Sequence, residues 1–280
     1  MTVQLTRMTK SVDDFSLGPV DLTLEPGTVT VLAGSNSSGK SLLLKTILNL
    51  VKKDDGEVKI FGEHVPGNTE QWIGRVGYMP QALIGCETFT GEELKSLVSR
   101  WYPNWDDCFF NTIAERLNIP LKKKYGKMSK GAQQKLSFAL TIPRNPELLL
   151  LDEPTSHMDI PAKQIWLDIL VEWMEAEERT ILMATHNVDE IRKIADYISV
   201  MRNGKIIGTF EKEAFTRSYK RYWLHKLPVH PVPGEAAREE GVIISRLPFE
   251  TEQYFRVQNI EYTDVRPLDL EEIITMMLKG

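Results

Sequence analysis

Residues 34–41 match the spacing G-x-x-x-x-G-K-[ST], in the order Gly34-Ser35-Asn36-Ser37-Ser38-Gly39-Lys40-Ser41. A loop of this kind binds phosphate groups, because its glycines permit a tight turn whose backbone N–H groups converge on phosphate oxygens. An apolar run precedes the loop at 28–33, and apolar residues at helical spacing follow it from Leu42. This context predicts a buried strand, the loop, and a helix whose positive end faces the phosphates.

Two side chains of the loop have separate roles in this interpretation. Lys40 is expected to contact the β- and γ-phosphates as a point charge, and the Ser41 hydroxyl is expected to ligate Mg²⁺. We therefore assign residues 34–41 and the adjoining Leu42 to a nucleoside triphosphate site. The alternative is a surface turn rich in glycine and serine, which the strand–loop–helix context disfavours.

A pair of carboxylates follows the four leucines at 148–151, which predict a buried strand. Open α/β sheets bind their ligands at the carboxyl ends of strands, where Asp152 and Glu153 would lie. Adjacent strand residues point to opposite faces, so the two carboxylates should differ in role. Asp152 is expected to hold Mg²⁺ through water, and Glu153 to polarise the water that attacks the γ-phosphate. The alternative is a solvated acidic pair before Pro154.

The composition of the 280 residues is that of a globular protein, with 42% hydrophobic and 26% charged residues and a net charge of −5. The negative charge argues against a nucleic-acid partner. Cys86 and Cys108 show no metal-binding spacing and fit a reducing cytosol. No apolar stretch approaches the ~20 residues of a membrane helix, and the N-terminus lacks a signal-peptide pattern. We therefore expect no transmembrane segment in this chain.

The order of the elements suggests an α/β domain interrupted by helices. Short strands fill residues 1–33, and a helical block extends from about 82 to 145, with caps expected at Thr90 and Asp106. The α/β pattern resumes after Glu153, and Asn203-Gly204 predicts a hairpin turn. Three prolines and a glycine within 227–234 predict a linker before the C-terminal residues.

With these features together, the chain resembles the ATP-binding cassette of ABC transporters over about residues 1–225. Gln81 resembles that family's glutamine loop, and 128–133 (Met-Ser-Lys-Gly-Ala-Gln) resembles its signature motif. Residues 156–159 resemble its D-loop, and His186 its switch histidine. The resemblance implies a P-loop NTPase fold: a RecA-like core with an antiparallel β-subdomain, an inserted helical subdomain at about 82–145, and a small C-terminal extension.

The resemblance also implies roles for residues outside the phosphate loop. Gln81 would sense Mg²⁺ and the γ-phosphate, sharing the metal with Ser41 and Asp152. His186 would donate to the γ-phosphate, completing a catalytic set with Glu153 and Gln81. Ser129 and Gly131 would bind the γ-phosphate of ATP held by an opposite subunit.

Several positions depart from the family pattern. Ser37 stands where the family usually has glycine, and Lys130 and Ala132 interrupt the signature. The adenine-stacking aromatic would fall near Ser11, which cannot stack, and Phe15 is the nearest substitute unless it is a core residue.

The function that this resemblance implies is that of an ATPase subunit of a bacterial ABC transporter, most similar to drug, lantibiotic or peptide exporters. It would work with transmembrane permease subunits and a second ATPase subunit, identical or different, at the cytoplasmic face of the membrane. The alternatives are a soluble ATPase switch, of which a cluster-assembly type fits best, and a non-hydrolysing module, which the intact Glu153 and His186 disfavour.

Residues 226–280 are expected to form an accessory extension that regulates the cassette or stabilises a dimer. Its apolar runs, such as 242–244 and 254–257, are short. We expect them to pack on the cassette or on a second subunit instead of forming a core of their own.

Overall fold

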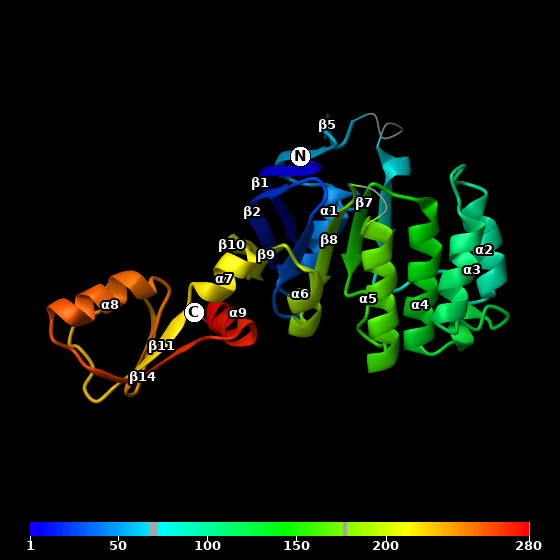
Figure 1. Cartoon of the computed structure of the whole chain (residues 1–280). Coiled ribbons are helices and arrows are strands. Elements are labelled where there is room, and N and C mark those ends of the chain that lie inside the picture. The colour runs from blue at the N-terminus through cyan, green and yellow to red at the C-terminus, as the bar shows by residue number, and fades with distance from the viewer. Residues whose placement is uncertain (68–71, 176–177, 280) are drawn as a thin grey trace.

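The structure is a computed structural model that describes residues 1–67, 72–175 and 178–279. Figure 1 shows a larger body, which contains the phosphate loop, and a smaller C-terminal unit beside it. The strands of the described residues form a four-stranded sheet, a six-stranded sheet and a second four-stranded sheet.

The six-stranded sheet has the strand order β10-β9-β3-β8-β7-β6. Its strands are β3 (Val29–Ala33), β6 (Val76–Met79), β7 (Leu148–Asp152), β8 (Thr180–Thr185), β9 (Tyr197–Arg202) and β10 (Lys205–Glu211). All neighbours are parallel except β9 and β10. Every residue of β3, β7 and β8 is buried, because elements cover both faces of the parallel sheet. The carboxyl ends of these three strands therefore meet at one edge.

The antiparallel sheet at the N-terminus has the order β2-β1-β4-β5. It comprises β1 (Val3–Val12), β2 (Phe15–Leu24), β4 (Asp55–Ile60) and β5 (Glu63–His64). One apolar core joins this sheet to α1 (Lys40–Ile47) and to one face of the six-stranded sheet, through residues such as Leu5, Leu44 and Leu150. This arrangement matches the predicted antiparallel subdomain.

The helical block contains α2 (Gly91–Ser99), α3 (Asp107–Arg116) and α4 (Lys130–Thr141), with short 3₁₀ turns η3 (Tyr125–Lys127) and η4 (Ile142–Arg144). The predicted caps are confirmed: Thr90 makes a capping box with Glu93, and Asp106 accepts from the Phe109 N–H at 2.8 Å. In Figure 1 these helices stand beside α5 (Ile160–Glu175) at the end of the molecule opposite the C-terminal unit.

The remaining cassette elements are η2 (Ile73–Arg75), α6 (Val188–Ile194) and α7 (Lys212–Arg217). The predicted hairpin between β9 and β10 is confirmed, and its turn residues Asn203 and Gly204 have φ values of 48° and 75°. Positive φ at both positions gives the backbone twist that a tight two-residue hairpin needs.

The C-terminal unit is a sheet of order β12-β13-β11-β14 with two helices. Its elements are β11 (Lys220–Leu224), β12 (Glu235–Glu239), β13 (Val242–Ser245), α8 (Pro248–Val257), β14 (Tyr262–Pro267) and α9 (Leu270–Lys279). Although β11 lies before the predicted division at 225/226, its pairing partners β13 and β14 lie after it.

The expectation that this extension lacks a core of its own is wrong. Tyr222, Leu224, Val232, Ile243 and Phe255 form a small buried cluster. The short runs suffice because α8 contributes the Phe255 ring, which meets Tyr222 edge to face at 5.4 Å between centroids.

The last helix, α9, connects this unit to the cassette and lies between the two in Figure 1. Its buried residues Leu270, Ile273 and Ile274 belong to the large core of the cassette. The Arg202 guanidinium of β9 donates to the Met277 carbonyl at 3.0 Å. The extension thus has its own small core and also packs on the cassette. Across the described ranges, no helix has the combination of length and apolar character that spanning a membrane requires.

Candidate nucleotide site

The phosphate loop lies between β3 and α1, and its two glycines are required for different reasons. A Cβ on Gly34 would lie 2.5 Å from the Met201 carbonyl oxygen and 2.7 Å from Ser38 Oγ, so no larger residue fits. Gly39, the residue before α1, has a φ of 104°, which L-residues with a side chain rarely adopt. The loop conformation therefore depends on both glycines of the motif.

Lys40 is buried at the centre of the loop. Its ammonium donates to the carbonyl oxygens of Gly34 at 2.8 Å and Ser35 at 3.0 Å. It also lies 3.4 Å from Glu153 Oε1 in an ion pair whose two side chains are both at least nine-tenths buried. A cation held by carbonyls and one carboxylate can exchange these partners for phosphate oxygens, which are also acceptors.

Ser41, Gln81 and Asp152 meet beside the loop. Ser41 Oγ donates to Asp152 Oδ1 at 2.9 Å, and Gln81 Nε2 lies 3.3 Å from Ser41 Oγ and 3.4 Å from Asp152 Oδ1. Burial raises the pKa of Asp152, and the hydrogen bonds from Ser41 and Gln81 act in the opposite direction.

Ser41 and Asp152 fit a magnesium site, because Mg²⁺ prefers oxygen ligands such as their hydroxyl and carboxylate groups. Gln81 lies beside them with its Nε2 turned toward both. In the described residues, no cluster of three or more His, Cys, Asp or Glu side chains could hold a metal alone. Mg²⁺ is commonly held by one or two carboxylates together with substrate phosphates, so a single Asp152 is sufficient.

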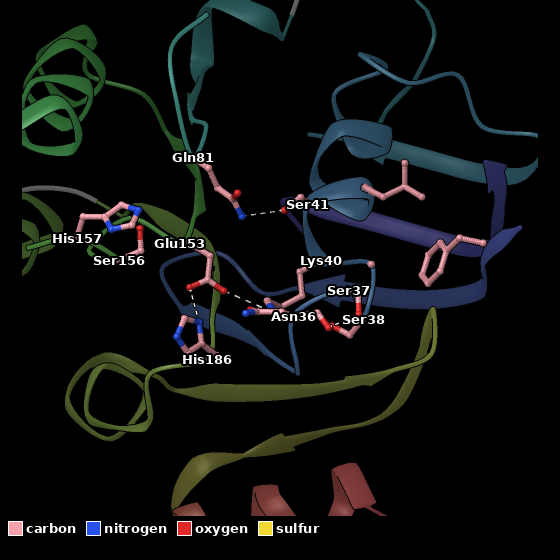
Figure 2. A pocket seen from close by; sticks show the side chains of 13 residues that line it. Asn36, Ser37, Ser38, Lys40, Ser41, Gln81, Glu153, Ser156, His157 and His186 are labelled. Atoms are coloured by element: carbon pink, nitrogen blue, oxygen red, sulfur yellow. Dashed lines mark hydrogen bonds and ion pairs between the residues drawn. The ribbon is translucent and has the colours of Figure 1, made fainter. Parts of the chain in front are cut away.

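Glu153 and His186 form the next pair. His186 Nδ1 lies 2.8 Å from Glu153 Oε2, and the histidine ring is about half exposed while the glutamate is buried. Figure 2 shows the Glu153 carboxylate between His186 and Lys40. A carboxylate in this position can accept a proton from a water molecule placed in the cavity.

These groups open onto one cavity of about 740 Å³ (Figure 2). The assigned residues that line it are Asn36, Ser37, Ser38, Gly39, Lys40, Ser41, Leu42, Gln81, Glu153 and His186. Gly34, Ser35 and Asp152 are absent from its lining. They lie one layer behind it, where Gly34 and Ser35 hydrogen-bond to Lys40 and Asp152 hydrogen-bonds to Ser41. The tertiary structure thus brings together residues from three strand ends and the Gln81 loop.

Ser129 and Gly131 are not part of this cavity. Ser129 caps α4 by accepting from the Ala132 N–H at 3.2 Å. A Cβ on Gly131 would lie 2.6 Å from the His157 carbonyl oxygen, so this glycine allows α4 to approach the loop after β7. Their place at the start of α4 leaves them outside the nucleotide cavity of their own chain.

Phe15 borders one end of the site, where it lines both the main cavity and an adjoining hollow of about 780 Å³. Val12 and Leu42 line the same hollow. Val12 is a further candidate for contact with the base of a nucleotide. Sequence reasoning missed it, and its only signal was its position next to Ser11. An aliphatic side chain can cover the face of a base without stacking on it as an aromatic ring does.

Sequence reasoning also missed two buried polar residues behind the site. Gln134 of α4 donates to the Gln81 carbonyl at 2.8 Å, which joins α4 to the loop after β6. Glu190 of α6 accepts hydrogen bonds from Thr155 and Thr185, which follow β7 and end β8. Neither residue has a sequence signal apart from its proximity to a landmark.

Comparison with known proteins gives a consistent result. Residues 17–156, which are half of the chain, match the family model described as ABC transporter. The chain is 24% identical over 288 aligned positions to the ABC transporter ATP-binding protein YtrB of Bacillus subtilis, and the match covers 99% of this chain and 98% of the relative. It is 30% identical to the achromobactin transport ATP-binding protein CbrD of Dickeya dadantii, with 66% of this chain and 72% of the relative covered.

Solved structures of ATP-binding cassettes share the fold. An ATP-binding subunit of an ABC transporter superposes with a TM-score of 0.69 at 21% identity, covering 78% of this chain and 92% of the other. A bacterial ABC transporter cassette solved as a dimer superposes with a TM-score of 0.65 at 20% identity, covering 75% and 98%. The predicted fold class is therefore confirmed.

Proposed function

The chain belongs to the ABC transporter family as an ATP-binding subunit with ATPase chemistry, and we propose that it powers transport by closing on a second cassette around ATP. The observation that carries this proposal is that Lys40, Ser41, Glu153 and His186 line one cavity, with Asp152 directly behind Ser41 at 2.9 Å. Each group matches one need of phosphoryl transfer: a cation, a metal ligand, a base and a donor.

Binding of the triphosphate would use the backbone N–H groups of 35–41 and the Lys40 ammonium. Lys40 would give up its 3.4 Å pair with Glu153 in favour of the β- and γ-phosphates. The glutamate is then free to orient the attacking water, so nucleotide binding and activation of the base are coupled. Mg²⁺ bound by Ser41 and Asp152, with Gln81 beside them, would neutralise charge that develops on the phosphates.

In the hydrolytic step, Glu153 would accept a proton as the water oxygen attacks the γ-phosphorus, while the bond from that phosphorus to the bridging oxygen breaks and ADP leaves. His186 would orient this carboxylate through Nδ1, which lies 2.8 Å from it, and would donate to a γ-phosphate oxygen through Nε2. Donation from both nitrogens requires the ring in its doubly protonated form. These contacts stabilise the negative charge of the transition state in a mostly buried site, where electrostatic interactions are strong.

The position of Ser129 and Gly131 supports a two-cassette arrangement. Both lie at the N-terminal end of α4, outside the cavity of their own chain. The positive end of this 12-residue helix and the Ser129 hydroxyl suit the γ-phosphate of a facing subunit. ATP shared in this way would bind the closed pair more tightly than the open one, which supplies the closing force.

The partners we propose are a second ATPase subunit and transmembrane permease subunits at the cytoplasmic face of the membrane. The full-length similarity to YtrB, itself described as an ABC transporter ATP-binding protein, supports the transport role. For the direction of transport we propose export, on the variant signature motif and the C-terminal extension. Relatives described as import and export proteins both match this chain, so direction needs a direct assay. ATP-dependent uptake into inverted membrane vesicles would establish export.

Closure of the two cassettes is tested with Glu153→Gln, because glutamine keeps the shape of the glutamate but cannot take a proton. We expect ATP to be retained and its hydrolysis to fall by about 10²–10⁴-fold. With ATP, the variant should elute from gel filtration as a dimer, alone or with the second cassette of its transporter. Glu172→Gln is the matched control, because Glu172 lies on the surface in an ion pair with Arg116. A monomer with bound ATP, in the presence of the co-expressed partner cassette, would refute dimer closure.

The transport role is tested by purification from membranes in mild detergent. Stoichiometric recovery of a multi-spanning protein supports the permease partner. Recovery of active ATPase only from the soluble fraction would favour a soluble switch.

A further inference from the structure

Glu190 is a buried carboxylate next to the candidate active site that has no assigned role. It lies in the first turn of α6, directly after β8 and His186, and only 3% of it is exposed. In the described ranges no ion pair joins it to a basic side chain. A carboxylate removed from water without a cation is costly unless hydrogen bonds satisfy its oxygens.

The donors to Glu190 lie next to Glu153 and His186, at the carboxyl ends of β7 and β8. Oε1 accepts from the Thr155 hydroxyl and from Asn187 Nδ2, the latter at 3.0 Å. Oε2 accepts from the Thr185 hydroxyl at 2.9 Å. Thr185 and Asn187 are the two neighbours of His186, and Thr155 lies two residues after Glu153.

The catalytic pair depends on such support for two reasons. The His186 ring is about half exposed, so packing alone does not fix its direction. Glu153 has a φ of 49°, in the left-handed region, which costs an L-residue roughly 1–2 kcal/mol. Strained backbone at an active site persists when surrounding contacts hold it in place.

The residue after β7 is also joined to β8 itself by a backbone hydrogen bond, from the Glu153 N–H to the Ala184 carbonyl at 2.9 Å. Glu190 adds a second link, through its side-chain hydrogen bonds with Thr155 after β7 and Thr185 at the end of β8. One carboxylate therefore sets the separation of Thr155 from Thr185, and with it the separation of Glu153 from His186.

We propose that Glu190 is a positioning residue that holds His186 in register with Glu153 for ATP hydrolysis. The inference rests on the roles proposed above for these two residues. Glu190 itself does not line the cavity, so it acts through the geometry of its neighbours. It should affect the chemical step and leave nucleotide binding by the phosphate loop largely intact.

The test is steady-state ATP hydrolysis by the full chain, with its permease partner where that is required for turnover. Glu190→Ala should lower kcat by about 10²-fold, the scale of a misplacement of about 1 Å, and change KM for ATP by less than about threefold. Glu190→Gln should recover most of the activity, because the amide keeps one acceptor oxygen and hydroxyl groups can rotate to accept from its NH₂. In a His186→Ala background, Glu190→Ala should cause little further loss.

Two threonines of β8 provide a matched pair if Glu190→Ala folds poorly. Thr180 is the first residue of β8 and Thr185 is the last, and both are 2% exposed. The Thr185 hydroxyl donates to Glu190 and accepts from the Asn187 N–H. The Thr180 hydroxyl bonds to Thr2 at 3.0 Å and accepts from the Gly27 N–H, at the other end of the strand. Thr185→Val should lower kcat, and Thr180→Val should lower the melting temperature without a comparable change in kcat.

The outcomes separate this inference from the proposed function. If Glu190→Ala lowers kcat by the same factor in the wild-type and His186→Ala backgrounds, the positioning role is overturned. A parallel loss of kcat and ATP affinity in Glu190→Ala would overturn it as well. Wild-type kcat in Glu190→Ala, with a large loss in His186→Ala, would overturn this inference alone. Wild-type kcat in His186→Ala would overturn the role proposed for His186, and this inference with it.

Discussion

The phosphate loop contains a residue whose replacement by glycine should stabilise the protein. Ser37 has a φ of 68°, in the left-handed region. Its side chain is exposed, and its hydroxyl reaches only the carbonyl of the neighbouring Asn36. Ser37→Gly would therefore remove backbone strain without removing a contact to another element.

The magnitude follows from two opposing effects. Relief of the left-handed strain is worth roughly 1–2 kcal/mol. The greater freedom of glycine in the unfolded chain opposes it by about 0.4–1 kcal/mol. The midpoints of the two ranges leave a net gain of about 0.8 kcal/mol in the free energy of unfolding, which corresponds to a rise of about 2–3 °C in Tm for a chain of this size.

The assay is scanning calorimetry of the nucleotide-free protein, with Ser35→Gly as the control. Ser35 is also an exposed serine of the loop, but it is not among the residues with positive φ. Glycine at position 35 relieves no strain, so it should lower Tm. The two variants carry the same chemical change and should shift Tm in opposite directions. A fall in Tm for Ser37→Gly equal to that for Ser35→Gly would refute the strain argument.

Three further predictions concern the cation, the metal ligand and the extension. Lys40→Ala should weaken ATP binding by about 10–10²-fold in a fluorescent-nucleotide titration, because a hydrogen bond to a charged group is worth ~1.5–3 kcal/mol; wild-type affinity would contradict the loop assignment. Asp152→Asn should abolish magnesium-dependent turnover yet raise Tm at pH 7. Burial raises the pKa of this carboxyl, so its ionised form costs stability at neutral pH, and the gain should shrink as pH falls through that raised pKa; a lower Tm at pH 7 would contradict this. A chain ending at Ser218 should retain ATP binding but melt earlier, because it loses α9, whose buried residues belong to the cassette core; loss of ATP binding in a folded truncation would place the extension within the nucleotide site.

Local chemistry in the sequence was sufficient to predict several parts of this protein. The phosphate loop, the strand that ends at Asp152, the caps at Thr90 and Asp106, and the hairpin at Asn203 each depend on residues within a few positions of one another. Backbone freedom, hydrogen-bonding type and apolar periodicity act over that range, so the printed order of residues contains the information.

The tertiary structure decided what depends on residues far apart in the chain. The pairing of β11 with β13 and β14, and the small core it completes, required strands separated by a proline-rich linker to meet. The hydrogen bonds of Glu190 to Thr155, and of Gln134 to Gln81, span 35 and 53 positions. No local pattern marks such pairs, because their geometry exists only once the parallel strands β6, β7 and β8 have packed side by side and brought their carboxyl ends to one edge.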